Sequence, residues 1–175
     1  GGSDSHLVYL LQDWPNRNDK IFIYYNSYNK GIIRVKRSLE NYQNIVFVEY
    51  NHLIINIFEF FNKIKYIRIL NFFFIPLRFI IMKNFFKKIF KRIKFDCLLA
   101  LNGGYPGSYA SLAAVIEAKK MGLKSVNMVV YHCAKKPMIF YHNFRLKLDM
   151  DVAKSLDNLI SISNATLDTI KERTK

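Results

Sequence analysis

Histidine, serine and glycine stand in this chain where a binding or catalytic site would need them. His132 follows the apolar run 125–131, Ser163 ends the run 158–163, and a Gly-rich turn follows the run 96–102. An imidazole can exchange protons near neutral pH, and backbone N–H groups in a Gly-rich turn before a helix can bind an anion. The pattern therefore indicates a site for a phosphorylated or otherwise anionic substrate.

The Gly-rich turn covers residues 102–107 and reads Asn-Gly-Gly-Tyr-Pro-Gly. It stands between an expected strand and an expected helix, where unpaired N–H groups and the positive end of the helix dipole favour an anion. An ordinary tight strand-to-helix turn is the alternative, and no Gly-Lys-Ser/Thr follows to make a Walker motif. The candidate substrate-binding residues of this turn are Asn102, Gly103, Gly104, Tyr105 and Gly107.

His132 is the strongest single candidate for a catalytic residue, although a lone histidine can equally have a structural role. Cys133 stands next to it, but neighbouring residues at a strand end point to opposite sides, so a Cys-His catalytic dyad is not expected. Two cysteines make no disulfide framework. No metal site is predicted, because the histidines are scattered and no Cys-x-x-Cys exists; they are His6, His52, His132 and His142.

Short apolar runs must position these residues. The runs 96–102, 125–131 and 158–163 are too brief for ordinary helices and predict strands, while 108–121 predicts a helix that ends at Gly122. Strands that alternate with helices favour a parallel sheet, and ligands gather at the carboxyl edge of such a sheet. We therefore expect the Gly-rich turn, His132 and Ser163 to converge on one crevice.

These stretches together resemble the N-terminal, acceptor-side domain of GT-B glycosyltransferases, specifically the retaining family 4-like enzymes of bacterial polysaccharide and lipopolysaccharide synthesis. The resemblance implies an α/β fold, a Rossmann-like doubly wound parallel sheet in three layers. It implies that His132 contacts the transferred sugar, that Gly1 and Gly2 lie near the donor diphosphate, and that Ser163 lies beside the interdomain cleft. Cys133 departs from the asparagine often found there. The stretches that carry the resemblance are residues 1–4, 102–107, 129–132 and 159–166.

The resemblance also sets expectations for the ends of the chain. Residues 1–175 are expected to form a single N-terminal domain that lacks its first strand and stops before a C-terminal donor domain. The implied partners are a nucleotide-sugar donor, bound mainly by that second domain, and a glycan or lipid-linked acceptor; no other cofactor is expected. This chain alone is expected to be an inactive part of a hexosyltransferase. The alternative for Gly1, Gly2 and Ser3 is an expression linker.

The chain carries 27 Lys and Arg against 13 Asp and Glu, a formal charge of +14. Such an excess favours anionic partners, namely nucleic acid, anionic lipid or phosphorylated substrates. The residue mixture is also what an AT-rich genome would encode whatever the function. No nucleic-acid recognition motif is present, so nucleic acid is not the expected partner.

The positive charge is concentrated in a Phe-rich segment, residues 60–95, which holds ten cations, ten phenylalanines and no acidic residue. On a helical wheel its apolar residues from Phe79 to Ile93 fall on one side and its cations on the other. The longest charge-free run, 69–77, is nine residues and contains Pro76, well short of the roughly 20 that span a bilayer. The predicted membrane-contact residues are Lys83, Lys87, Lys88, Lys91, Arg92 and Lys94.

Packing on the sheet would explain the apolar stripe. It does not explain why the segment has no acidic residue, because an ordinary solvated face mixes charges of both signs. Several cations near an anionic surface can hold a protein there without an anchor. We therefore expect residues 64–94 to place the protein at the cytoplasmic face of the membrane as a peripheral protein. A non-catalytic membrane-docking or partner-binding α/β domain is the alternative function.

Overall fold

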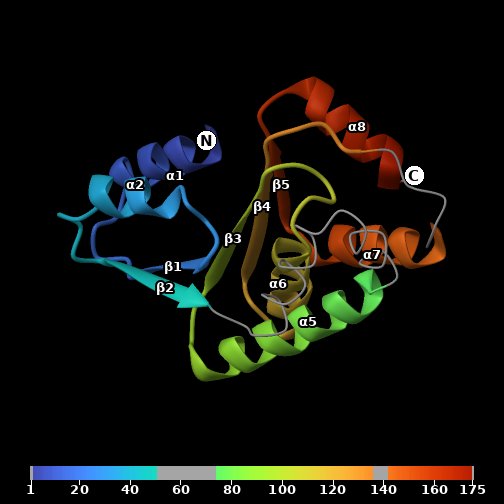
Figure 1. The fold of residues 1–175 in the computed structure, drawn as a ribbon, viewed down its shortest axis with the longest axis horizontal. Helices are drawn as coiled ribbons and strands as arrows, with labels where there is room; N and C mark the ends of the chain where they lie inside the picture. Colours follow the sequence, from blue (N-terminus) through green and yellow to red (C-terminus); the bar gives the residue numbers. More distant parts are fainter. Residues whose placement is uncertain (1, 51–73, 136–141, 175) are drawn as a thin grey trace. The chain divides into compact units, whose positions relative to one another are not determined.

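The computed structural model describes residues 2–50, 74–135 and 142–174 (Figure 1). The chain is an α/β protein with parallel strands in two small sheets. It divides into two compact units, Gly1–Asn71 and Phe72–Lys175. Figure 1 labels the helices and strands, and its labels are used below.

The first unit is built around a two-stranded parallel sheet. β1 and β2 pair from Ile21 opposite Ile45 to Asn26 opposite Tyr50. Two helices supply the rest of its core, which includes Leu11, Val35 and Leu39. The elements of this unit are α1 (Gly2–Gln12), β1 (Ile21–Asn26), α2 (Ile32–Ser38) and β2 (Ile45–Tyr50).

The second unit holds a three-stranded parallel sheet in the order β3-β4-β5, which confirms the three strands expected between residues 96 and 163. Each strand is followed by a helix, as the alternating pattern predicted. Its elements are α5 (Ile75–Arg92), β3 (Cys97–Asn102), α6 (Tyr109–Lys120), β4 (Ser125–Val130), α7 (His142–Ser155), β5 (Asn158–Ser161) and α8 (Asn164–Thr174).

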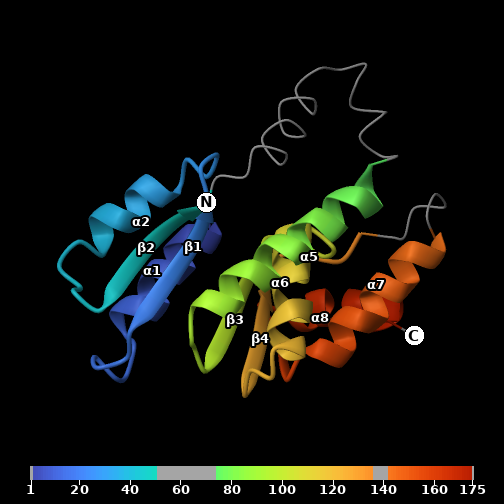
Figure 2. The ribbon, with the colours of Figure 1, turned by 90° about the horizontal axis from the view of Figure 1, so that it is seen from below.

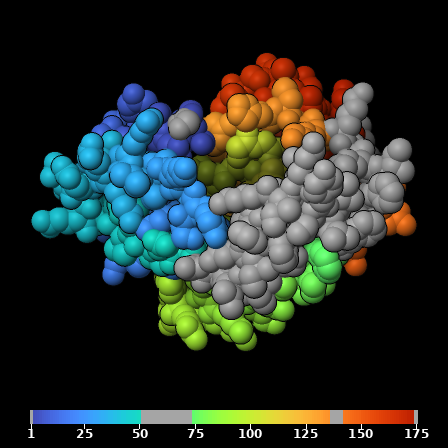
Figure 3. Space-filling model, in the orientation of Figure 1, coloured from blue at the N-terminus to red at the C-terminus, as the bar shows by residue number. Residues whose placement is uncertain are grey.

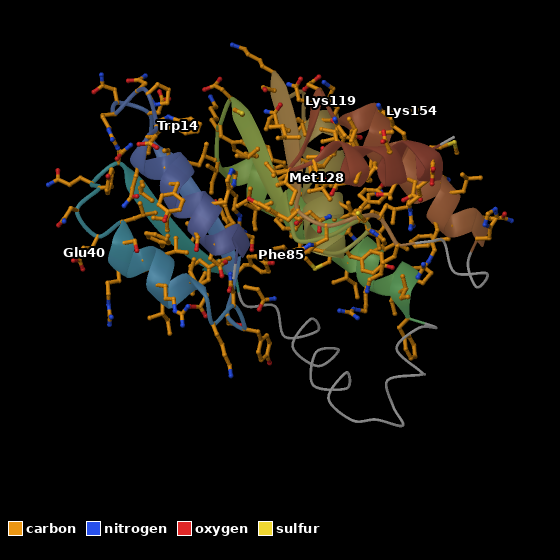
Figure 4. The ribbon with its side chains drawn as sticks, turned by 90° about the horizontal axis from the view of Figure 1, so that it is seen from above. Trp14, Glu40, Phe85, Lys119, Met128 and Lys154 are labelled. Atoms are coloured by element: carbon orange, nitrogen blue, oxygen red, sulfur yellow. The ribbon has the colours of Figure 1, made fainter. Side chains whose placement is uncertain are left out.

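α6 is the central helix of the second unit. It packs against β3 and β4, and α5 and α7 lie against it (Figure 2). Every residue from Leu112 to Ala118 is buried, which explains why its sequence is apolar on almost all sides. Ser108 caps the start of the helix, and Gly122 follows its end with a φ of 78°, the left-handed conformation that the sequence predicted there. In the middle strand, Met128 is fully buried (Figure 4).

α5 is the amphipathic helix that the sequence predicted, with Pro76 in its first turn. The part of the Phe-rich segment before residue 74 lies outside the described residues. No helix in the described part of the chain has the length and apolar character to cross a membrane. The buried residues of α5 are Ile75, Phe79, Met82, Phe86 and Phe90.

Polar side chains join the amino ends of the three strands. Asn127 Nδ2 donates to Ser125 Oγ at 2.9 Å and to Cys97 Sγ at 3.5 Å. Asn158 Nδ2 donates to Asn127 Oδ1 at 2.8 Å. This chain of contacts, called the asparagine ladder below, runs across β3, β4 and β5.

Candidate functional site

The carboxyl ends of β3, β4 and β5 meet at one edge, at the top of the sheet in Figure 1. Asn102 pairs with Val130, and Val130 pairs with Ser161, so the three strands end level with one another. The chain segments that follow them are 103–108, 131–135 and the start of α8. We call this region the carboxyl edge.

The Gly-rich turn and His132 are neighbours at the carboxyl edge. A Cβ atom built on Gly104 would lie 3.5 Å from His132 Cβ. Tyr131 N–H donates to the carbonyl of Asn102 at 3.2 Å, which aligns the two segments just below that contact. The structure thus brings together two of the three features that the sequence predicted to converge.

Asn102 shapes the turn from inside. It is fully buried, its Nδ2 donates to the carbonyl of Pro106 at 3.2 Å, and its Oδ1 accepts from Ser108 N–H at 3.0 Å. The turn needs Gly107, whose φ is +47° and whose added Cβ would lie 1.8 Å from the carbonyl oxygen of Gly104. Both ends of the Asn102 amide therefore hold the turn in place.

Tyr105, another candidate substrate-binding residue, is only 2% exposed. Its ring lies below the guanidinium of Arg173, whose Cζ is 5.4 Å from the ring centroid. Burial raises the pKa of its phenol, and the negative charge of Asp149 raises it further, so the phenol stays protonated. Tyr105 therefore supports the turn from beneath, while Gly103 is exposed at its surface.

A buried ion pair fastens the two loops of the carboxyl edge to the helices behind them. Arg173 Nε donates to Asp149 Oδ2 at 2.7 Å, and the two side chains are 2% and 3% exposed. Arg173 Nη1 also donates to the carbonyl of Lys135, and Lys135 N–H donates to the carbonyl of Tyr105 at 2.9 Å. We call this circuit the Asp149–Arg173 latch. It joins the loop after β3, the loop after β4, α7 and α8.

Sequence reasoning missed the latch, although one signal was present. The buried residues of α7 recur at helical spacing, and an aspartate stands among them. A carboxylate in a buried stripe requires a partner, because an unpaired buried charge is costly. The buried residues of α7 are Arg145, Leu148, Asp149, Val152 and Ser155.

His132 is exposed, and the chain around it is held in place. Ala134 N–H donates to Thr169 Oγ1 at 2.8 Å, and Cys133 Sγ lies 3.9 Å from Thr166 Oγ1. Both threonines belong to α8. An exposed imidazole on a fixed backbone can donate or accept a hydrogen bond, or transfer a proton, without reorganisation of the loop.

Ser163 caps α8, as the sequence predicted. Its Oγ accepts from Thr166 N–H at 3.2 Å and donates to Thr166 Oγ1 at 3.1 Å. The same threonine lies against Cys133, so the start of α8 is tied to the loop that carries His132. Ser163 is exposed despite these contacts.

The other predicted site residues belong to α1 or to the segment 83–94, or lie outside the described residues. Gly2 is the first residue of α1 in the first unit, and Gly1 is outside the described residues. Lys83 forms an ion pair with the buried Glu117 at 3.6 Å, and burial, followed by the charge of Lys120, lowers the pKa of Lys83. The exposed cations of the predicted membrane-contact set are Lys87, Lys88, Lys91, Arg92 and Lys94.

A small cavity of about 200 Å³ lies beneath the carboxyl edge. Its lining is mostly aliphatic, and its polar members are Tyr105, Asp149 and Lys171. The lining residues are Tyr105, Met128, Asp149, Val152, Ala153, Leu156, Leu159, Ile170 and Lys171.

Comparison with known proteins gave no match to a family model, a curated protein or a solved structure. Among the described residues, no three His, Cys, Asp or Glu side chains cluster so that they could hold a metal ion.

Proposed function

We propose that this chain is the acceptor-binding domain of a sugar-nucleotide-dependent glycosyltransferase of the GT-B type, acting in bacterial cell-surface polysaccharide or lipopolysaccharide synthesis. The observation that carries the proposal is the proximity of the exposed His132 to Gly104 at the carboxyl edge of a parallel sheet. The proposal includes the finer fold, a doubly wound Rossmann-like arrangement in three layers. Open parallel sheets bind their ligands at this edge.

The chemistry of the edge suits a sugar. Gly104 leaves open space next to His132, where an added Cβ would be in van der Waals contact with His132 Cβ. Two helices, α6 and α8, begin at the same edge, and the positive ends of their dipoles favour a phosphate nearby. In this proposal His132 donates a hydrogen bond to a sugar hydroxyl, and the exposed Gly103 borders the acceptor.

Transfer from a nucleotide sugar depends on positioning both substrates and on stabilising the departing phosphate. This chain would supply the acceptor side of that arrangement. The donor would be held mainly by a C-terminal donor domain, so the present chain alone would bind but not turn over substrate. Ser163 would face the donor from the start of α8.

The test is His132→Ala in the protein that carries both domains. Loss of a hydrogen bond made in the transition state should lower turnover by at least about tenfold, equivalent to about 1.4 kcal/mol. His142→Ala is the matched control, because His142 is an exposed histidine at the start of α7 and should leave turnover unchanged. Steady-state kinetics of the two variants test this role. Turnover of His132→Ala equal to that of His142→Ala would rule out the role of His132.

A second candidate function is peripheral docking at the inner face of the cell membrane. The observation that favours it is the set of exposed cations on and just after α5, a helix without a single acidic residue. Each such cation near an anionic surface adds about 1 kcal/mol of binding. Co-sedimentation with vesicles tests it, and equal binding to neutral and anionic lipid would contradict it.

A further inference from the structure

We propose that α5 docks on an anionic phospholipid surface in a tilted orientation, with its N-terminal half inserted more deeply than its C-terminal half. This inference rests on the proposed membrane docking and adds an orientation to it. α5 forms part of the surface of its unit, coloured light green in Figure 3.

The outward face of α5 has an apolar zone near its beginning. Leu77 is 47% exposed and Ile80 is 53% exposed, whereas other leucines and isoleucines of the chain are buried in its core. They face away from the buried stripe that includes Phe79 and Met82, since helical residues repeat at about 100°. Two exposed aliphatic side chains one turn apart can enter the boundary between headgroups and acyl chains.

The same face becomes cationic toward the end of the helix. Lys87, Lys88 and Lys91 are exposed and, at about 100° per residue, lie on the same side as Leu77 and Ile80. Leu77 and Lys91 are about 21 Å apart along the axis at a rise of 1.5 Å per residue. One face therefore presents aliphatic groups at one end and ammonium groups at the other.

Lys83 marks the boundary between the two zones. Its position would place a charge beside Ile80, but its ammonium pairs with the buried Glu117 instead. Asn84, which is exposed and neutral, occupies the next place on the outward face. The lysine nearest to Ile80 on this face is thus drawn toward α6.

Anionic lipid fits both zones, whereas nucleic acid fits only one. A phosphate backbone would satisfy the lysines but would leave Leu77 and Ile80 in water. A bilayer surface offers phosphates to the lysines and an apolar layer, just below, to the aliphatic side chains. The order of the zones along the helix then requires that the Leu77 end lie deeper.

The first experiment measures co-sedimentation of the full chain with vesicles of phosphatidylcholine alone and of phosphatidylcholine with phosphatidylglycerol. The triple change Lys87→Gln, Lys88→Gln and Lys91→Gln should weaken binding to the anionic vesicles by about a hundredfold, at about fivefold per cation. Leu77→Ser with Ile80→Ser should weaken it by at least about tenfold. Lys147→Gln with Lys154→Gln, on the exposed face of α7, is the control; it removes two positive charges from another helix and should change binding far less.

The second experiment measures depth. Leu77→Trp and Lys91→Trp are compared by quenching with brominated lipids, after subtraction of the signal of Trp14, the single native tryptophan. Stronger quenching of Leu77→Trp supports the tilt. Equal quenching, with charge-dependent binding intact, overturns the tilt but leaves membrane docking standing.

Two outcomes would overturn the docking as well. Unchanged binding of the triple Lys variant, or equal binding to neutral and anionic vesicles, would show that α5 is not an anionic-lipid surface. Binding of single-stranded DNA that competes fully with anionic vesicles and is insensitive to Leu77→Ser with Ile80→Ser would assign the cations to nucleic acid. None of these results bears on the kinetic test of His132.

Discussion

An ion pair lies at each end of the three-stranded sheet, and the two pairs differ in burial. At the carboxyl edge, Asp149 and Arg173 are almost completely buried. At the amino end, Lys119 and Asp157 pair with side chains that are 36% and 34% exposed. Burial sets how strongly the two charges of each pair interact, because water competes for an exposed pair but not for a buried one.

The difference follows from what each pair holds. Arg173 donates to the carbonyl of Lys135 in the loop that carries His132. The latch therefore fixes the backbone of that loop while the side chain of His132 is exposed. Asp157 Oδ2 accepts from Val126 N–H at 2.8 Å, and Asp157 N–H donates to the Val126 carbonyl at 2.8 Å, so Asp157 lies just before the first residue pair of β4 and β5. A site loop requires a buried anchor, whereas a strand end in the middle of a sheet does not.

Of the substitutions considered, Arg173→Met should lower the free energy of unfolding most. It leaves the carboxylate of Asp149 buried without its cation, which should lower the free energy of unfolding by about 3–5 kcal/mol. Urea denaturation of the second unit within the full chain measures the change. Lys119→Met at the amino end is the matched control and should have a much smaller effect; similar losses at both ends would show that burial does not separate the two pairs.

Gly107→Ala should have the next largest effect. The positive φ and the contact with the Gly104 carbonyl together should cost at least about 2 kcal/mol. Gly103→Ala is the control in the same turn, because nothing lies within 4 Å of its added Cβ, and it should change stability by less than about 0.5 kcal/mol. Thermal unfolding of the two variants compares them, and equal stability would contradict the assigned turn.

Ser163→Ala should remove the cap of α8 and lower the free energy of unfolding by about 1 kcal/mol. Ser163→Asn should retain most of that stability, since asparagine caps as well as serine does. Chemical denaturation of both variants separates capping from a role in substrate binding. An effect on substrate affinity in Ser163→Asn, with stability preserved, would favour the donor-side role.

The ion pair of Lys119 and Asp157 at the amino end should affect mainly the pH dependence of the free energy of unfolding. The hydrogen bond from Lys119, followed by that from Val126 N–H, holds the pKa of Asp157 below its usual 3.8. A depressed pKa contributes stability that is present above the unfolded value and is lost as the pH falls through the folded value. The fall in stability from pH 5 toward pH 2 should therefore be shallower in Asp157→Asn, and identical pH profiles would contradict the pairing.

The sequence predicted those parts of the fold that depend on local patterns. The strands of the second unit, the helix 108–121 with its glycine stop and the cap at Ser163 all follow from residue types a few positions apart, and the structure has them. The same holds for the buried stripe of α5. Periodicity and capping are properties of neighbouring residues, so they can be inferred without a tertiary structure.

Long-range partners could not be inferred in this way. Asp149 and Arg173 are 24 positions apart on different helices, and only the packed structure shows that they meet. Lys83 belongs to a cationic stripe by its spacing, but the buried Glu117 on the neighbouring helix draws it inward. Tyr105 was a candidate substrate-binding residue of the Gly-rich turn, and its burial beside Arg173 could not be inferred from neighbouring residues.

The asparagine ladder has a consequence for the opposite end of the same strands. If β5 shifted along β4 by one residue, Asn158 would lose Asn127 and would turn to the other face of the sheet. The ladder therefore favours the observed register of the three strands, and this register sets where the carboxyl end of each strand lies relative to its neighbours. His132 and Gly104 follow β4 and β3, and the contact of Asn127 Nδ2 with Cys97 Sγ belongs to the register of these two strands, so it helps to place His132 beside Gly104 from the opposite end of the sheet.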